Sequence, residues 1–114
     1  MTLEEFINNL QHNPQQISFE HTMKLIDELY IFKPVSFRNG NIENAIGENS
    51  GSCKLLAFAK LNKLSKLQTL QCFGDYYRID VLGSPEGDNH QNIRNFMQTA
   101  WEGIAFTEEP LTAR

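Results

Sequence analysis

The sequence predicts a mainly α-helical domain of about five helices, with one long irregular loop that leaves room for a short β-ribbon. Three observations support this fold class. Apolar residues recur at helical spacing over most of the chain, capping signals stand where these stretches begin, and the helical period is lost between residues 33 and 52. A chain of 114 residues, 40% of them hydrophobic, is expected to form one domain spanning 1–114 around a single core.

The first two predicted helices have clear start and stop signals. Thr2 and Glu5 stand three residues apart, as in a capping box, and lead into an apolar face at helical spacing. Pro14 ends the first helix, because proline disfavours helical geometry in the residue before it. Ser18 is expected to cap the second helix, and Pro34 follows its end. We therefore expect two amphipathic helices in the first third of the chain.

The long loop is predicted to contain a tight turn at Asn39-Gly40. Val35 and Phe37 alternate with polar residues ahead of it, and Asn-Gly is the commonest dipeptide of a tight hairpin, since both residues tolerate positive φ. Connections of about twenty residues are long for a compact domain and are usually functional or disordered. This segment is therefore one of the places where we expect a binding site.

Two further helices follow the loop. The third is predicted to start near Ser52, which is expected to cap it. A capping box of Ser65 and Gln68 is predicted to start the fourth. The apolar pattern carries the fourth helix past Gly74, where glycine costs about 1 kcal/mol relative to alanine. We therefore expect Gly74 to allow another backbone to approach closely.

A fifth helix is predicted after the second glycine- and proline-rich stretch. Asp88 and Gln91 are expected to cap it, and its apolar stripe runs on to Trp101 and Ile104. The segment from Phe106 to Leu111 is short, and we expect it to be extended.

The composition excludes several classes of function. A net charge of −4, a pI of about 5.3 and the lack of a Lys/Arg cluster predict neither a nucleic-acid nor an anionic-membrane partner. No apolar run approaches the roughly 20 residues that span a bilayer, and the acidic N-terminus does not resemble a secretory signal. Cys53 and Cys72 lack metal-binding spacing, so we expect no metal, no cofactor and a reducing, cytoplasmic environment.

Side chains able to bind or react are concentrated between Asn39 and Trp101, at predicted helix starts and turns. Ten of them form the candidate binding set: Glu43, Asn44, Glu48, Asn49, Cys53, Lys54, Arg78, Asp88, His90 and Arg94. The glycine-rich turn before the third helix offers unpaired amides and a lysine to an anion, although it lacks the Walker A pattern. A glycine turn that leads into a capped helix is the simpler interpretation of the same residues.

A reactive thiol is a second hypothesis. Cys53 falls in the first turn of the third predicted helix, where the helix start lowers the pKa of a thiol. His90 and Asp88 at the start of the fifth helix would complete a Cys–His–Asp arrangement if the two helix starts met. Buried cysteines are more often small core residues, so a structural role is the simpler expectation.

The other charged candidates also have structural interpretations. Asp75 and Arg78, at i and i+3, are expected to pair on the helix surface, and catalysis by Asp75 or Asp80 would require burial. His90 and Arg94 lie at the edge of the core stripe of the fifth helix. A polar network that ties this helix start to the long loop is the simpler interpretation.

Several sequence blocks, in order, resemble the HopJ type III effector family. They are N-G-x-x-E-N-A-x-G-E-N-x-G-S-C-K, L-A-F-A-K-L-N, C-F-G-x-Y-Y-R-x-D-V-L and D-x-H-Q-N-I-R-N-F-M, followed by W-E-G-I, and they cover the chain from about Phe19 to its end. The resemblance implies a compact domain and brings no established activity, cofactor or catalytic residue. The family name comes from a plant-pathogen effector, but the acidic, capped start here departs from the Ser-rich, acid-poor start of secreted effectors.

We therefore expect a cytoplasmic binding or regulatory domain. Its polar site, formed by the 40–54 loop and the helix starts, would take an unknown small molecule or a protein segment. Two alternatives stay open: a type III secreted effector that acts on a host protein, and an enzyme that depends on Cys53 or on a carboxylate.

Overall fold

The computed structural model describes residues 1–114 and has a mainly helical fold, as predicted. The α-helices are α1 (Leu3–His12), α2 (Phe19–Leu29), α3 (Ser50–Leu61), α4 (Lys66–Gln71) and α5 (Gln91–Thr99). Two 3-10 segments, η1 (Pro14–Gln16) and η3 (Ala100–Gly103), and a π-helix, η2 (Tyr76–Val81), complete the helical elements. The strands are β1 (Tyr30–Phe32), β2 (Phe37–Asn39), β3 (Ile42–Asn44), β4 (Ile104–Phe106) and β5 (Leu111–Ala113). None of the helices is long and apolar enough to cross a membrane.

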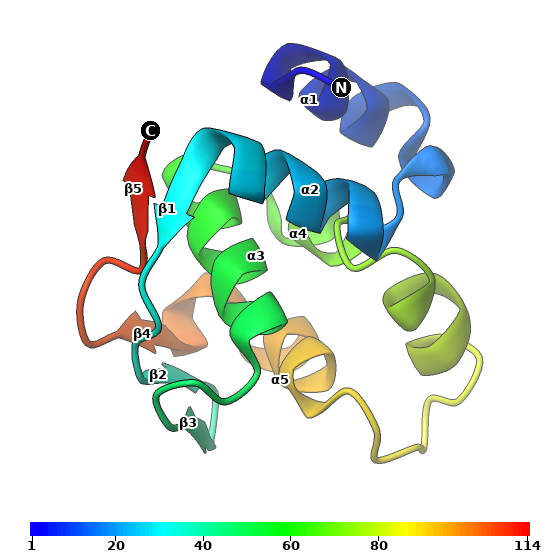
Figure 1. Ribbon diagram of the computed structural model, residues 1–114. Helices are drawn as coiled ribbons and strands as arrows, with labels where there is room; N and C mark the ends of the chain where they lie inside the picture. Colours follow the sequence, from blue (N-terminus) through cyan, green and yellow to red (C-terminus); the bar gives the residue numbers. More distant parts are fainter.

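The helices pack around α3, and two small antiparallel sheets close one side of the molecule (Figure 1). α2 packs along α3, and α1 and η1 contact α4. One sheet pairs β1 with β5, which brings the end of the chain beside the end of α2. The other has the order β3-β2-β4, and α5 packs against β2 and β3. The first turns of α3 and α5 thus come to lie near the same edge of the hairpin.

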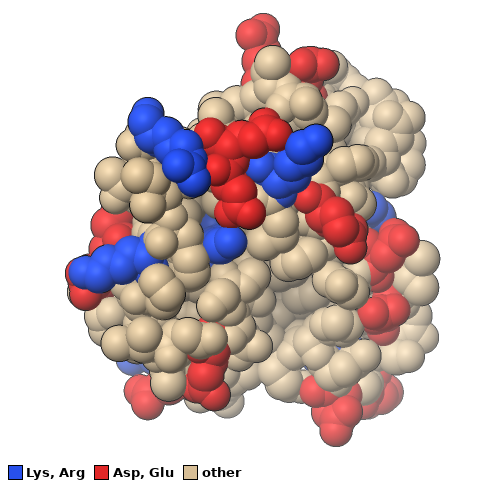
Figure 2. Space-filling view, in the orientation of Figure 1, with Lys and Arg blue, Asp and Glu red and all other residues tan.

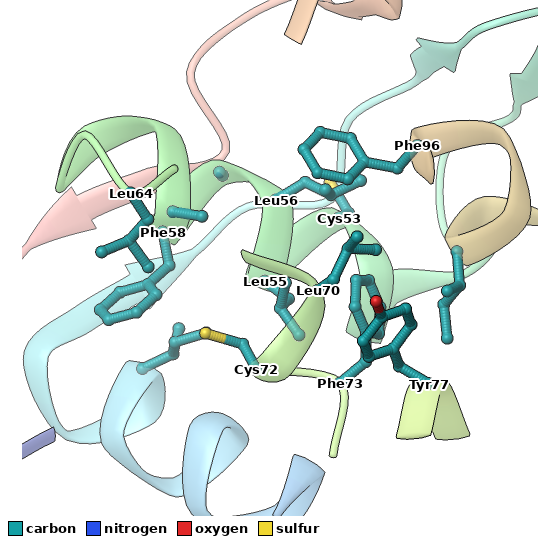
Figure 3. Close-up of a cluster of buried hydrophobic side chains, with 14 of the residues drawn as sticks. Cys53, Leu55, Leu56, Phe58, Leu64, Leu70, Cys72, Phe73, Tyr77 and Phe96 are labelled. Atoms are coloured by element: carbon teal, nitrogen blue, oxygen red, sulfur yellow. The ribbon is translucent and has the colours of Figure 1, made fainter. Parts of the chain in front are cut away.

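The core explains why α3 is central. Five consecutive residues of this helix, from Leu55 to Ala59, are buried, so it is apolar on nearly every side, as expected for a helix enclosed by others. The ring of Phe58 meets Phe6 of α1 edge-on, with 5.7 Å between centroids. Cys53 and Cys72 lie in this same core, among apolar side chains (Figure 3). Both cysteines are free thiols.

Three helix starts are capped as predicted. Thr2, Ser18 and Ser65 each accept a hydrogen bond from the backbone amide three residues on, and each capping box is closed reciprocally. At Ser18 the returning acceptor is the Nδ1 atom of His21 rather than a carboxylate or amide oxygen. All three cap residues have extended backbone conformations, with ψ of 165°, 162° and 167°. This geometry directs the side-chain oxygen at the free amide.

The prediction of one continuous fourth helix is wrong. α4 ends at Gln71, Gly74 adopts a φ of +64°, and η2 follows as a separate element. A Cβ atom at Gly74 would lie only 2.7 Å from the backbone nitrogen of Phe19, so the start of α2 packs directly against this glycine. The predicted close backbone approach is therefore confirmed, and it breaks the helix instead of sitting inside it.

The predicted caps of the third and fifth helices are also wrong. Neither Ser52 nor Asp88 is a cap: Asn49 precedes α3 and His90 precedes α5. Both cap residues are left-handed, each with a φ of 51°, and neither side chain caps its helix. The Asp88 carbonyl instead accepts a hydrogen bond of 2.6 Å from the Gln91 side chain. The cap residues of α1, α2 and α4 have extended backbones, which direct their side chains at the free amides. A left-handed backbone does not direct the side chain there.

The predicted β-ribbon is confirmed, with its turn displaced by one residue. β2 and β3 pair antiparallel, and Asn39 is the last ladder residue, opposite Ile42. The turn is therefore formed by Gly40 and Asn41, with Gly40 at a φ of +64°. This displacement frees the Asn39 side chain to point into the protein, where it is fully buried.

Candidate functional site: a cleft between two helix starts

A cleft with a volume of about 480 Å³ opens between the first turns of α3 and α5 on one side and α2 and η2 on the other. Gly51 and Ser52 come from α3, and Gln91 and Asn92 come from α5. Five of its eleven lining residues are hydrophobic, and none is Lys, Arg, Asp or Glu. Figure 2 shows the surface hollowed on this side of the molecule, with acidic side chains around the hollow. The lining is thus polar and aromatic but carries no permanent charge.

The helix starts at this cleft have no side-chain caps. Cys53 is the first residue of α3 whose amide bonds back to Asn49, so the amides of the three residues before it lack an intrahelical acceptor. In α5 the amides of Ile93 and Arg94 both bond to the His90 carbonyl, which leaves the two amides ahead of them free in the same way. Amides of this kind carry partial positive charge and favour hydrogen-bond acceptors.

Aromatic rings form the opposite wall. Phe73 stacks on Phe19 with a centroid distance of 6.4 Å, Phe19 meets Tyr76 at 5.2 Å, and Tyr76 meets the His90 ring at 5.1 Å. A Cβ atom on Gly51 would lie 2.8 Å from the Phe19 ring, so only glycine lets this ring approach the start of α3. The rings therefore form a continuous aromatic wall from the core to the mouth of the cleft.

His90 is fixed at the mouth by Asp80. Its Nε2 atom lies 3.0 Å from an Asp80 carboxylate oxygen, and 28% of the His90 side chain is exposed. In the neutral imidazole an Nε2–H that donates to Asp80 leaves Nδ1 as the acceptor. Asp80 and Tyr76 stand four residues apart on η2 and both contact the same ring. π-helical turns are frequent at functional sites.

A buried network of asparagine amides supports both helix starts. Asn39 donates to the backbone and side-chain oxygens of Asn92, at 2.7 and 3.0 Å. Asn44 and Asn92 exchange two hydrogen bonds, at 3.2 and 3.1 Å, and Asn49 donates to Asn44 at 2.7 Å. The network therefore joins the hairpin to the residues that begin α3 and α5.

The thiol is not part of the cleft. The Cys53 side chain is 1% exposed, and burial raises its pKa to about 11. The expected lowering of the pKa at a helix start is therefore wrong, because desolvation of the buried thiolate outweighs the hydrogen bond with the Val35 backbone that lowers the pKa. His90, the proposed partner of this thiol, pairs with Asp80 instead of with Asp88.

The remaining cationic candidates act within the scaffold. Lys54 pairs with Asp27 at 3.0 Å, and its ammonium lies over the Phe32 ring. Arg78 lies 3.8 Å from Asp75, as the spacing predicted. The Arg78 guanidinium also donates to the carbonyl oxygens of Pro14, Gln15, Ile17 and Gln71, and so clamps η1 to the end of α4.

The acidic candidates lie elsewhere on the surface. Glu43 and Glu48 border a separate groove beside the hairpin, together with the buried Asn44. Glu48 accepts a hydrogen bond of 2.8 Å from the Ala45 amide. Asp88 is exposed in the segment that leads to α5. No group of three or more His, Cys, Asp and Glu side chains is arranged to hold a metal ion.

Of the ten candidate residues, two line the cleft, Asn49 and His90. Sequence reasoning missed Phe19 and Asn92, because a core-like aromatic and one asparagine among several carry no distinguishing pattern. It considered Asp80 only as a catalytic acid and did not predict its bond to His90. The adjacent Tyr76 and Tyr77 did give a signal, since neighbouring residues on a helix face different directions. Tyr77 is 7% exposed and Tyr76 is 39% exposed, as that argument predicted.

Comparison with known proteins identifies the family and one close structural relative. The model of a family described as HopJ type III effector protein matches residues 3–111. A crystal structure described as that of the unknown-function protein VPA0580 is 53% identical, with a TM-score of 0.97, over 100% of this chain and 95% of the other. None of the curated proteins compared with the chain matches it.

Proposed function

The chain belongs to the HopJ family, and we propose that it is a small binding domain whose cleft between α3 and α5 takes a small molecule. The ligand that we propose carries a hydrogen-bond acceptor, a carboxylate or a carboxamide, next to a planar ring. One observation carries the proposal: two uncapped helix starts and an aromatic wall face the same cleft.

The free amides favour an acceptor on the ligand. Ser52 and Gln91 line the cleft in the first turns of α3 and α5, where backbone N–H groups lack intrahelical partners. A carboxylate or amide oxygen placed between these turns would receive hydrogen bonds from both helices. The lining holds no lysine or arginine that would demand a full negative charge. A neutral carboxamide therefore satisfies the site as well as an anion does.

The aromatic wall favours a planar ring on the ligand. Tyr76 is 39% exposed and packs between Phe19 and His90, so one part of its ring is available to a ligand. Aromatic contacts of this type contribute about 0.5–1.5 kcal/mol beyond the area that they bury. The volume of about 480 Å³ falls within the range of roughly 300–1,000 Å³ that is usual for small-molecule sites.

The test is a ligand-observed NMR screen of small carboxylates and carboxamides, each with and without an aromatic ring. We expect binders among the ring-bearing members, and we expect Tyr76→Ala to weaken their binding about tenfold. Ile79→Ala is the matched control, because Ile79 is also exposed on η2, at 61%, but does not line the cleft.

The control decides the outcome of the screen. The proposal fails if no member of the set binds the wild-type protein, or if Ile79→Ala and Tyr76→Ala weaken binding equally. If a peptide binds the cleft and none of the small molecules does, the occupant is a protein segment and the small-molecule proposal fails.

The family description favours a second candidate function, a type III effector that acts on a host protein. We infer a cytoplasmic location. An export assay in a strain with a working type III apparatus decides between the two, since retention of the intact chain supports the cytoplasmic domain and export supports the effector.

A further inference from the structure

The segment between η2 and α5 is an exposed strap that ends at the cleft. We define the strap as residues 82–89, all of which are exposed. Its last residue precedes His90, which lines the cleft and makes the bond to Asp80. The path of the strap therefore determines where the His90 ring lies.

Two side chains from α5 bond to the strap: Gln91 donates once, to the Asp88 carbonyl, and Arg94 makes four hydrogen bonds. The Nε and Nη2 atoms of Arg94 donate to the backbone oxygen and to the side-chain oxygen of Asn89, both at 2.6 Å. Its Nη1 atom donates to the carbonyl oxygens of Ser84 and Pro85, at 3.0 and 3.3 Å. All four acceptors belong to the strap, and Arg94 forms no salt bridge with a carboxylate. The guanidinium thus serves as a clasp on the backbone of the strap.

The strap is shaped to fit this clasp. A Cβ atom on Gly87 would lie 2.7 Å from the Arg94 Nη2 atom, so the bare backbone of Gly87 passes over the guanidinium. Three residues further along, His90 has a left-handed φ of 51°, which is unfavourable for a residue with a Cβ atom. Such a conformation persists only where the surroundings impose it. The two hydrogen bonds from Arg94 to Asn89, directly before His90, are positioned to impose this conformation.

We infer that Arg94 is a positioning residue: by clasping the strap it holds His90 against Asp80 and Tyr76 and thereby sets the affinity of the cleft for its ligand. The part of this inference that concerns affinity rests on the proposed function. The part that concerns His90 does not, because the Asp80 bond and the Tyr76 contact are made within the chain itself.

The geometry requires arginine and not merely a positive charge. A guanidinium offers five N–H donors in a rigid plane, which reach acceptors on Asn89 and on Ser84 at the same time. A lysine ammonium at this position is a compact point charge on a flexible stem and does not satisfy that arrangement. Arg94→Lys therefore retains the charge and removes the clasp.

The experiment compares Arg94→Lys with the wild type by hydrogen exchange, by the NMR signals of the His90 ring and by ligand titration. We expect strap amides to exchange at least about tenfold faster and the binders from the screen to lose about tenfold in affinity. The His90 ring signals should move toward those of a histidine free of Asp80. Arg38→Lys is the matched control, because Arg38 is exposed on β2 and does not line the cleft.

A second variant keeps the test decisive if Arg94→Lys does not fold. Gly87→Ala pushes a methyl group against the guanidinium without removing a donor, and it should shift strap exchange and the His90 signals in the same direction. Unchanged strap exchange and unchanged His90 signals in both variants would overturn the inference. If no compound binds the wild type, the proposed function fails, and exchange and ring signals still decide the role of Arg94.

Discussion

The starts of α1, α2 and α4 differ from the starts of α3 and α5 in one respect that bears on function. The first three are closed by their own sequence, with Thr2, Ser18 and Ser65 each bonded to an amide of the first turn. The other two are preceded by the left-handed residues Asn49 and His90, which cap nothing, and both open into the cleft. A helix start that is closed locally contributes stability. A start that is held by distant residues and left open has donors to offer a ligand.

The comparison is sharpest for the thiol in the first turn of α3. If the open helix start activated Cys53, this cysteine would react rapidly at neutral pH, whereas burial raises its pKa to about 11. We expect alkylation at pH 7 to be about 100-fold slower in the folded chain than in the unfolded chain, and to accelerate as the pH rises toward 11. In the Cys72→Ala variant Cys53 is the one remaining thiol, so mass spectrometry follows its alkylation alone. Equal alkylation rates in the folded and the unfolded chain would show that the start of α3 exposes a reactive group.

Breaking the asparagine network is expected to have the next largest effect, because this network supports the two helix starts that lack local caps. Asn92→Ala removes the side-chain oxygen that accepts from both Asn39 and Asn44, and it removes the amide that donates to Asn44, so three hydrogen bonds are lost in the core. We expect the free energy of unfolding to fall by about 2–3 kcal/mol, as for other buried polar groups that lose their acceptors. Denaturant titration measures the loss, and exposed Gln98→Ala on the same helix should change the stability by less than about 0.5 kcal/mol. Equal effects of the two variants would mean that the network does not support the helix starts.

Two serines allow a direct contrast between closed and open starts. Ser65 accepts a hydrogen bond of 3.1 Å from the Gln68 amide, so Ser65→Ala should cost about 1 kcal/mol. The hydroxyl of Ser52 in the first turn of α3 caps nothing, so Ser52→Ala should leave the stability within about 0.5 kcal/mol of the wild type. The thermal unfolding midpoints of the two variants measure both effects. A loss of stability in Ser52→Ala as large as in Ser65→Ala would contradict the distinction between open and closed helix starts.

The smallest expected effect is the response of a closed start to pH. Hydrogen bonds from the Thr2 amide and hydroxyl hold the pKa of Glu5 below its usual value of 4.5. The stability contributed by this ionised carboxylate is therefore fully present above pH 4.5 and is lost as the pH falls through the lowered pKa of the folded chain. Unfolding midpoints of the wild type and Glu5→Gln should converge in acid, and a constant difference at all pH values would contradict the prediction.

The closed starts were predictable from the sequence because a capping box lies within four residues. The open starts were not, since left-handed Asn49 and His90 are held by contacts from the hairpin, η2 and the strap. The pairing of His90 with Asp80 spans a break in the helical pattern and a strap, so helical spacing gave no sign of it. Gly74 was recognised as a packing glycine, but its positive φ depends on the backbone of α2 and is visible only in the fold.

The most direct test of the central claim is backbone chemical-shift mapping of the strongest binder from the NMR screen. We predict the largest shifts at the amides of Ser50, Gly51 and Ser52 in α3 and of Gln91 and Asn92 in α5. The chemical shifts of the first-turn amides of α1 and α4, which Thr2 and Ser65 cap, should not change. Shifts centred on the closed starts, or absent from the start of both α3 and α5, would contradict the claim that this cleft is the binding site.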